Sequence, residues 1–259
     1  TDEIDSDVTI ISIRNSIDTT NETYKKANDK VNFVMPIISG YKVEFEKALF
    51  ASPFKEDLKA KFGEFLFKQI EAEFKCFDEK IIPDMQKEND LVSKYDELMA
   101  SAQIEFKGEK LNLSQLGKYM SDLDKETREA AAKLYWGFIE EHDEEFGNIY
   151  DELVKVRTEM AKKLGFKDFT ELGYLRLGRT DYNALMVEGY RNQIKKDVVK
   201  VVAKLRKRQA DRLGIKKPIF LDYNIQFLSG NAKPCGDTNY LVDCAKKMYT
   251  EMSPESGEF

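Results

Sequence analysis

The segment that decides how this chain is organised reads Ala161-Lys-Lys-Leu-Gly165-Phe-Lys-Asp168-Phe-Thr-Glu-Leu-Gly173-Tyr-Leu-Arg176-Leu-Gly178-Arg179-Thr-Asp181-Tyr182-Asn183. It joins two long helical patterns. Gly165 suits the left-handed conformation that commonly follows the last turn of a helix. Asp168 can cap a short helix over residues 169–177, and Asp181 can cap the helix after that.

This segment holds too many large apolar side chains for an exposed linker. Phe166, Phe169 and Leu172 lie at helical spacing, with Tyr174 and Leu177 beside them. Such a segment is stable only when its apolar side chains are removed from water. We therefore expect it to be buried between neighbouring helices.

The composition is that of a folded, helix-rich protein. The 259 residues are 42% hydrophobic and 34% charged, and only 6 Pro and 14 Gly interrupt the helical patterns. This length allows one large or two small domains. No run of about 18 apolar residues is present, so we expect no membrane-spanning helix. The acidic start of the chain lacks the apolar stretch of a signal peptide.

Charge and cysteine content narrow the possible partners and location. A net charge of −6 argues against nucleic-acid binding. Residues 195–217 hold ten Lys or Arg, and a solvated helix face is the favoured interpretation of this basic run. Cys76, Cys235 and Cys244 are odd in number and far apart, which predicts no disulfide framework and a cytoplasmic location.

Helical patterns dominate the first 102 residues. Within Ile17-Asp-Thr-Thr20, Asp18 or Thr19 is the predicted N-cap of the first helix. Pro36 should kink or break this helix, because proline lacks the amide hydrogen that the helix needs. Ser52-Pro53 is predicted to begin another helix, whose apolar stripe runs over residues 54–74. Residues 79–102 form a further predicted helix.

Two segments have β character. Apolar and polar residues alternate around Gly108 over residues 103–113, which predicts a short β-hairpin. Residues 218–234 are β-prone and predict one or two short strands, with a turn at Ser229-Gly-Asn231. We therefore expect a mainly α, elongated multi-helix array with one or two short β-hairpins. Its predicted regions are residues 1–113 and 114–259.

Residues 114–259 also read mostly as helices. Helix starts are predicted at Ser114, at Asp122 or Asp124, at Asp237 and at Ser253-Pro254. A long helical pattern over residues 131–164 should be interrupted near His142. The helix over residues 182–213 should end at Gly214 and bury one line of apolar side chains: Tyr190, Ile194, Val198, Val201 and Leu205.

No complete catalytic motif is present. A zinc-peptidase helix needs two His four residues apart with a Glu between them. His142 is the only His, and His142-Asp-Glu-Glu-Phe146 places Phe where the second ligand must stand. The sequence contains no Gly-x-Ser-x-Gly and no glycine-rich phosphate loop. Arg176 and Arg179 could hold a carboxylate, but pairing with a helix acid is the favoured interpretation.

Eight short segments, in order along nearly the whole chain, carry a resemblance to a known family. They are Ile17-Asp-Thr-Thr20, Ala100-Ser-Ala-Gln-Ile-Glu-Phe106, Leu111-Asn-Leu-Ser-Gln-Leu116, Tyr150-Asp-Glu-Leu-Val-Lys-Val-Arg157, Ala161-Lys-Lys-Leu-Gly165, Glu171-Leu-Gly-Tyr174, Gly178-Arg-Thr-Asp-Tyr-Asn183 and Met252-Ser-Pro-Glu255. Together they resemble a middle piece of the oligoendopeptidase F family, zinc metallopeptidases related to thimet oligopeptidase.

The resemblance implies a larger helical fold around a deep cleft in which short peptides are hydrolysed. In the family, the zinc-binding His-Glu-x-x-His motif lies downstream of the Ser-Pro-Glu segment, which here places it beyond Phe259. No metal ligand or catalytic residue can therefore be carried onto this chain. Its expected role is the helical wall of the cleft, with zinc held by a missing C-terminal half. Phe227, Gly230 and Asn231 are the substrate-binding candidates, although they could simply form a turn.

The leading hypothesis is a part of a zinc-dependent oligoendopeptidase that is inactive alone. The chain stops at Phe259, inside an apparent helix start, which favours a fragment. Its face toward the missing half should then be apolar and exposed. The alternative is a free-standing, non-catalytic helical binding or scaffold protein. A third possibility is a two-piece enzyme whose metal-binding half is a separate chain.

Overall fold

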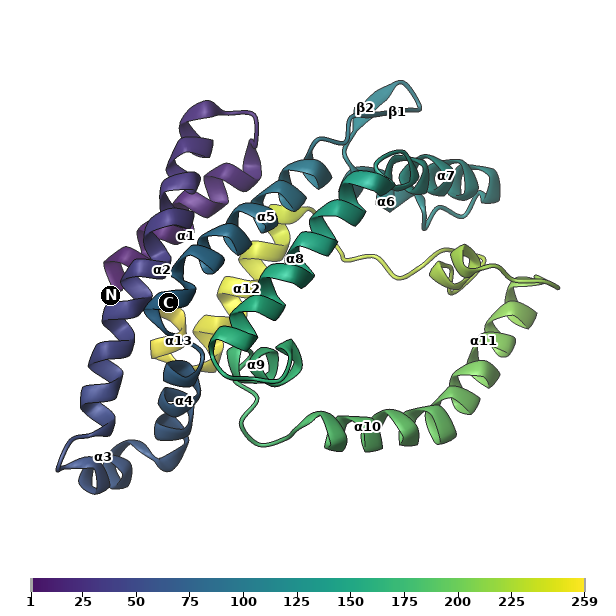
Figure 1. Ribbon diagram of the computed structural model, residues 1–259. Coiled ribbons are helices and arrows are strands. Elements are labelled where there is room, and N and C mark those ends of the chain that lie inside the picture. The colour runs from purple at the N-terminus through teal and green to yellow at the C-terminus, as the bar shows by residue number, and fades with distance from the viewer. Residues whose placement is uncertain (1, 259) are drawn as a thin grey trace.

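The computed structural model describes residues 2–258, and of Asp2 it describes the backbone alone. The described chain is mainly α-helical with one two-stranded antiparallel sheet, as predicted (Figure 1). In chain order its elements are α1 (Asp2–Ile17), α2 (Glu22–Phe50), α3 (Lys55–Phe62), α4 (Glu64–Lys75), η1 (Glu79–Ile81), α5 (Ile82–Ala100), β1 (Ile104–Phe106), β2 (Glu109–Leu111), α6 (Leu113–Tyr119), α7 (Lys125–Glu141), α8 (Asp143–Lys163), α9 (Phe169–Arg176), α10 (Ala184–Gln193), η2 (Ile194–Val198), α11 (Val199–Leu213), η3 (Phe220–Asn224), α12 (Thr238–Met252) and α13 (Pro254–Glu258).

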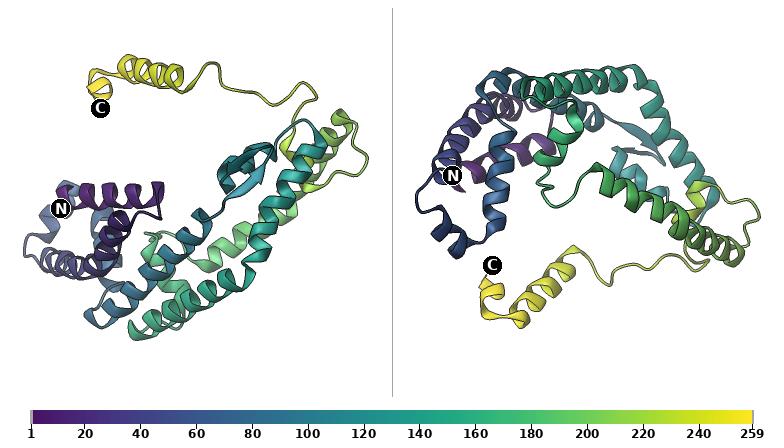
Figure 2. Two further views of the ribbon diagram at one scale, coloured as in Figure 1. Left: turned by 90° about the horizontal axis from the view of Figure 1, so that it is seen from above. Right: turned by 60° about the horizontal axis from the view of Figure 1, so that its bottom comes forward.

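The elements form two regions of different character. Helices α1–α9 with the hairpin form a layered assembly, which we call the bundle (residues 2–177). Helices α10–α13 and their connections, which we call the arc (residues 178–258), leave the bundle after α9 and return to it at η3, whereas α12 and α13 lie clear of it (Figures 1 and 2). No helix within residues 2–258 is both long enough and apolar enough to cross a bilayer.

Residues 161–177 lie at the centre of the bundle. Helix α8 packs along α5, and α9 packs against both α8 and α4. Met160, Ala161 and Leu172 form a core with Ile81, and each of these four residues is at most 2% exposed. Phe166 and Phe169 pack against this core, so the predicted burial is confirmed for them and for Leu172. It is wrong for Leu177, which is 66% exposed at the end of the segment.

The ends of this segment follow the predicted chemistry. Gly165 has φ of +89°, and the amide of the next residue, Phe166, donates to the carbonyl of Ala161 at 2.9 Å. This pattern closes the last turn of α8. The Asp168 carboxylate accepts the amide of Thr170 at 2.8 Å and caps α9, also as predicted.

Pro36 does not break α2, so the predicted break is wrong, whereas a kink at this residue stays a prediction. The helix is continuous over residues 22–50, and Pro36 is buried within it. A proline at this position leaves the carbonyl of Asn32 without its usual amide donor. The side chain of Asn89 on α5 supplies a replacement at 3.1 Å, and Gln86 donates to the carbonyl of Phe33 at 2.7 Å. Neighbouring side chains therefore support the helix through the proline.

Three predicted N-caps are wrong, and in each case an asparagine nearby is the actual cap. The N-cap is Asn21 where Asp18 or Thr19 was predicted, Asn112 where Ser114 was predicted, and Asn183 where Asp181 was predicted. Asparagine is as good an N-cap residue as aspartate or serine, so residue type alone could not show which of several neighbouring residues is the cap. Asp124 and Asp237 are caps as predicted. Helix α1, before Asn21, was not predicted, since its apolar residues form no consistent stripe.

The segment from Ser52 to Phe74 holds two helices where one was predicted. The Ser52 hydroxyl accepts the amide of Phe54 in a turn, and α3 begins only at Lys55. Gly63 separates α3 from α4 with φ of +89° and ψ of 153°, a conformation that L side chains rarely adopt.

The hairpin and the break at His142 are both confirmed. Ile104 pairs with Leu111 across the two strands, and Lys107 and Gly108 form the turn with positive φ. His142 separates α7 from α8. Its Nδ1 lies 2.9 Å from the carbonyl of Phe138, so the single histidine has a structural role at a helix end.

Three ion pairs join α5 to α8, which lie on opposite sides of the predicted boundary at residue 113. The division of the chain into two regions at that boundary stays a prediction. Lys163 contacts Asp84 at 2.6 Å, and Lys87 contacts Glu152 at 2.7 Å. Between them, Arg157 contacts Glu88 at 2.6 Å.

The predicted buried line on the long helix of the arc is wrong. Helicity does run from Ala184 to Leu213, with a π turn at η2. However, Tyr190 is 65% exposed, Val201 54% and Leu205 53%. Periodicity correctly found an apolar face, but the described residues leave most of it exposed.

Candidate functional site

The segment that carries the predicted substrate residues follows α11. Gly214 ends that helix in the left-handed conformation, with φ of +70°, as predicted. The β-prone residues that follow form no strand, which corrects that prediction. They form the short 3-10 helix η3 and then an extended loop that leads to α12.

Side chains of α11 explain why this segment needs no strand partner. The Gln209 amide donates to the carbonyls of Tyr223 and Ile225, and the Arg212 Nε donates to the carbonyl of Gln226 at 2.9 Å. Backbone carbonyls must find donors when they leave water. Here one helix face provides those donors in place of a neighbouring strand.

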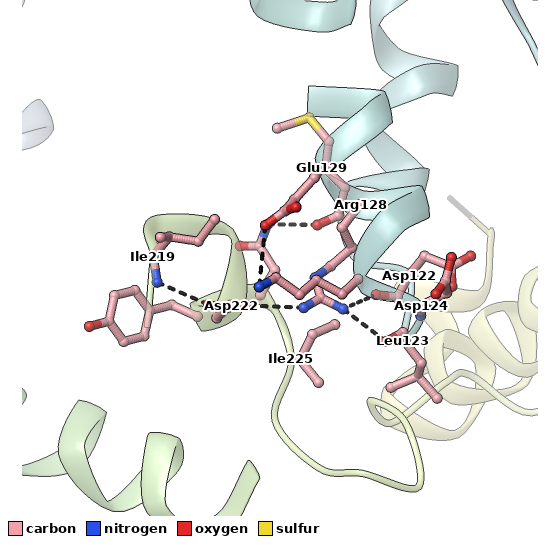
Figure 3. A network of polar contacts seen from close by, with 12 residues as sticks. Asp122, Leu123, Asp124, Arg128, Glu129, Ile219, Asp222 and Ile225 are labelled. Atoms are coloured by element: carbon pink, nitrogen blue, oxygen red, sulfur yellow. Dashed lines mark hydrogen bonds and ion pairs between the residues drawn. The ribbon is translucent and has the colours of Figure 1, made fainter. Parts of the chain in front are cut away.

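A buried ion pair anchors η3 to the bundle (Figure 3). Arg128 on α7 contacts Asp222 at 2.9 Å, and both side chains are 5% exposed. Arg128 also donates to the carbonyls of Asp122 and Leu123, while Asp222 accepts the amide of Ile219 at 2.9 Å. A buried charge pair is stable only when such additional hydrogen bonds satisfy it. This contact fixes where the candidate segment starts relative to the bundle.

The structure brings Phe227, Gly230 and Asn231 together in one turn. The amide of Gly230 donates to the carbonyl of Phe227 at 3.0 Å, and Gly230 has φ of +101°. The Asn231 amide group accepts from the amide of Gln226 and donates to the carbonyl of Asn224, both at 2.7 Å. Asn231 is thus fully engaged in shaping the turn, whereas the ring of Phe227 is 50% exposed.

The side chains available to a ligand at this turn are aromatic and cationic. The Arg212 guanidinium lies 4.7 Å from the centre of the Phe227 ring, within cation–π distance. Leu228 beside it is 71% exposed. Such a surface can contact an apolar side chain of a peptide, but it offers no group for acid–base chemistry. The substrate role of these residues stays a prediction.

Many apolar side chains of the arc helices are exposed. On the long helix the most exposed of them are Leu185, Met186, Tyr190, Val199, Val201 and Leu205, and on α12 they are Tyr240, Met248, Tyr249 and Met252. None of the residues of α10 or α12 is buried. Exposed apolar side chains on a helix are typical of a face that contacts another part of a protein or a partner.

The described residues do not fit a zinc site. Within residues 2–258, no three His, Cys, Asp or Glu side chains are grouped closely enough to hold a metal ion. His142 is bonded at a helix end, and Cys76, Cys235 and Cys244 are free thiols. Burial raises the pKa of Cys76 to about 11, so this thiol is protonated at neutral pH and a poor ligand.

Comparison with known proteins shows which proteins this chain is similar to. A model of the peptidase M3 N-terminal domain matches residues 1–77. A solved structure of PZ peptidase A with an inhibitor is 47% identical, covers 97% of this chain and has a TM-score of 0.91. Over nearly its whole length, the chain is therefore similar to solved peptidases described as PZ peptidase A and oligoendopeptidase F. The predicted resemblance is thereby confirmed.

Two further solved structures agree with this assignment. A protein from Bacillus anthracis strain Ames, described as an oligoendopeptidase F, is 45% identical over 96% of this chain, with a TM-score of 0.89. Another protein described as an oligoendopeptidase F is 43% identical over 97%, with a TM-score of 0.91. The chain spans only 44–46% of the length of these three relatives. No curated protein matches the chain.

Sequence reasoning missed the contacts that hold the candidate segment in place. Arg128 and Asp222 are 94 residues apart, and no local pattern links them. Gln209 and Arg212 lie in a basic run that reads as solvated surface, yet both bond the segment. For Arg176, by contrast, the favoured interpretation is confirmed, because it pairs with Glu88 of α5 at 2.8 Å.

Proposed function

We propose that this chain forms the helical wall of the substrate cleft in a zinc-dependent oligoendopeptidase that hydrolyses short peptides. The observation that carries the proposal is the 47% identity to PZ peptidase A over 97% of this chain. At this level of similarity the relative provides the best guide to the role of the chain. A location in the cytoplasm is part of the same proposal.

The chemical step is assigned to residues outside this chain. The metal-binding side chains would have to come from elsewhere, because none are grouped within residues 2–258. The contribution of the chain is then to position peptides and exclude water. The exposed turn at Phe227, beside the Arg212 guanidinium, is the proposed contact for an apolar side chain of the peptide. Alone, the chain is expected to hydrolyse nothing.

The exposed apolar surface of the arc supports this division of roles. Tyr190, Val201 and Leu205 are each more than half exposed, although their spacing is that of a core-facing line. We assign this surface to the contact with the rest of the peptidase fold. The same contact would serve a two-piece enzyme whose metal-binding half is a separate chain.

A non-catalytic helical binding or scaffold protein remains the second candidate. The observation that favours it is the absence of any metal-binding group within the described residues. Under this alternative the arc would bind another protein and no hydrolysis would follow. Peptide binding without cleavage, even after the metal-binding part of a relative is supplied, is the outcome that distinguishes it.

The test is a gain-of-function fusion. The part of PZ peptidase A that follows the region matched by this chain is joined to Phe259, and hydrolysis of an internally quenched peptide is measured. We expect no hydrolysis by the chain alone and chelator-sensitive hydrolysis by the fusion. The matched control changes the Glu of the family His-Glu-x-x-His motif to Gln, which should abolish activity. Chelator-sensitive hydrolysis by the chain alone, or a folded but inactive fusion, would contradict the proposal.

A further inference from the structure

A polar cavity lies within the bundle, on residues that the proposed cleft wall does not use. It has a volume of about 530 Å³ and lies among α1, α2 and α5, with side chains of α8 and α9 at one end. Of its lining residues, only Val92 and Ala100 are apolar. The others are Ser12, Asn15, Ser16, Thr19, Asn28, Asn32, Glu88, Asn89, Ser93, Asp96, Arg157 and Arg176. A cavity this polar is built for a polar occupant.

The middle of the cavity presents hydrogen-bonding groups that are only partly satisfied. Asn15 lines the cavity and is 8% exposed, and its side-chain amide makes no hydrogen bond within the described residues. Ser93 Oγ accepts from Asn28 at 3.2 Å and from Asn32 at 2.9 Å, so its own hydrogen is free to donate. The Ser93 hydroxyl and the Asn15 Nδ2 are therefore donors for the backbone carbonyls of an occupant.

One end of the cavity is positive. Arg176 binds both oxygens of Glu88, at 2.8 and 3.2 Å, and Arg157 binds one of them through its Nε. Two guanidinium groups therefore meet a single carboxylate. Burial alone would raise the pKa of Glu88, but the hydrogen bonds and charges of the two arginines lower it. The two terminal nitrogens of Arg157 make no hydrogen bond within the described residues, so they can bind a second carboxylate.

The other end is negative. Asp96 lines the cavity and has no basic partner among the described residues, and partial burial raises its pKa above the ordinary value. It lies eight residues beyond Glu88 on α5, which is about 12 Å along a helix. An extended tripeptide spans about 10 Å between its ends. Flexible Arg and Asp side chains can close the remaining distance.

We propose that this cavity binds a short zwitterionic peptide, with its amino terminus at Asp96, its backbone at Asn15 and Ser93, and its carboxylate at Arg157. The charge pattern selects a zwitterion with separated ends. The choice of a peptide rests on the proposed function, since an oligopeptidase produces such fragments. The site lies apart from the Phe227 turn and is therefore a second, product-sized site.

The first test uses ligand chemistry and needs no variant. Trialanine is titrated into the protein by calorimetry with a chelator present, so that hydrolysis does not consume it. We expect one site per chain. N-acetyl-trialanine, which lacks the terminal positive charge, should bind at least tenfold more weakly. Equal binding of the two peptides, or no binding of either, would mean that the cavity holds only water, and the proposal would be wrong.

The second test locates the binding site. Asp96→Asn should weaken trialanine binding about tenfold, whereas Asp90→Asn should leave it unchanged, because Asp90 is exposed on the same helix and does not line the cavity. Equal affinities in the two variants would refute the site. Binding that is sensitive to Asp96 in a protein whose fusion shows no hydrolysis would refute the proposed function and leave this site standing. Hydrolysis by the fusion without trialanine binding would refute this site and support the proposed function.

Discussion

The central helices of the bundle and the long helix of the arc have similar amphipathic patterns but differ in burial. In the bundle, Leu116 and Leu172 are at most 1% exposed and lie in clusters of buried apolar side chains. In the arc, Leu205 and Tyr190 stand at the same kind of spacing and are more than half exposed. An amphipathic pattern therefore specifies that a face needs covering, but the covering element must be supplied by the rest of the fold.

The two regions meet at the Arg128–Asp222 pair, and its loss is the largest effect that we expect. Arg128→Met leaves the Asp222 carboxylate buried without its partner, which should cost about 3–5 kcal/mol of unfolding free energy. The exposed Lys207–Asp211 pair within α11 is the matched control, since Lys207→Met should cost at most about 0.5 kcal/mol. Urea unfolding followed by circular dichroism measures both.

A double variant separates two effects of the Arg128 change: the lost attraction within the ion pair and the cost of a buried carboxylate without a partner. Replacing both partners, Arg128→Met with Asp222→Leu, should recover much of the stability lost by the single change. If Arg128→Met costs no more than Lys207→Met, the proposed anchor between bundle and arc does not hold.

Leucine truncation compares the two regions directly. Leu172→Ala removes a side chain that is 1% exposed and should destabilise the protein by about 2–5 kcal/mol. Leu205→Ala removes one that is 53% exposed and should cost less than about 1 kcal/mol, mostly from lost apolar contact. Similar losses in both variants would show that the arc is packed in solution and would remove the distinction.

A pH-dependent prediction concerns α2 and α4 within the bundle. Burial, together with the neighbouring Glu73 carboxylate, raises the pKa of Glu46 to about 7, against 4.5 for the free side chain. The folded state therefore holds a proton more tightly than the unfolded state. This stability is fully present below about pH 4.5 and is lost as the pH rises through about 7.

Glu46→Gln keeps a neutral side chain at every pH and is the matched comparison. Between about pH 5 and pH 8, the wild type should lose roughly 1–2 kcal/mol of unfolding free energy relative to this variant. Urea titrations at several pH values measure the difference. Parallel stability curves for the two proteins would be inconsistent with a proton on Glu46.

The smallest predicted effect concerns the proline in α2. Asn89→Ala should cost about 1 kcal/mol, because it leaves the carbonyl of Asn32 without a donor. In a Pro36→Ala background the alanine amide can make the helical bond, so the same change should cost clearly less. Equal costs in the two backgrounds would mean that Asn89 does not compensate for Pro36.

The local parts of the fold could be predicted from sequence. Gly165 and Asp168 gave the ends of α8 and α9, and the alternation around Gly108 gave the hairpin, because each depends on neighbouring residues alone. The break predicted at Pro36 failed for a different reason. The helix continues through Pro36 because side chains of α5, at least fifty residues away along the chain, donate to the carbonyls near the proline.

The candidate site was only partly predictable. The turn at Phe227, Gly230 and Asn231 was found from its composition, but its neighbours were expected to be strands. Whether a β-prone segment pairs depends on a partner strand being available, and here Gln209 and Arg212 bind its carbonyls first. The predicted burial of residues on the long helix of the arc was wrong for the same reason, because burial requires another element that covers them.

Hydrogen exchange measured by mass spectrometry tests the central claim most directly. We predict that amides of α5 and α8 exchange slowly, whereas those of α10, α11 and α12 exchange far faster in this chain alone. In the active fusion with the PZ peptidase A part, the arc should become protected while the bundle stays unchanged. Arc helices as protected as α5 in the isolated chain, or unprotected in an active fusion, would contradict the account.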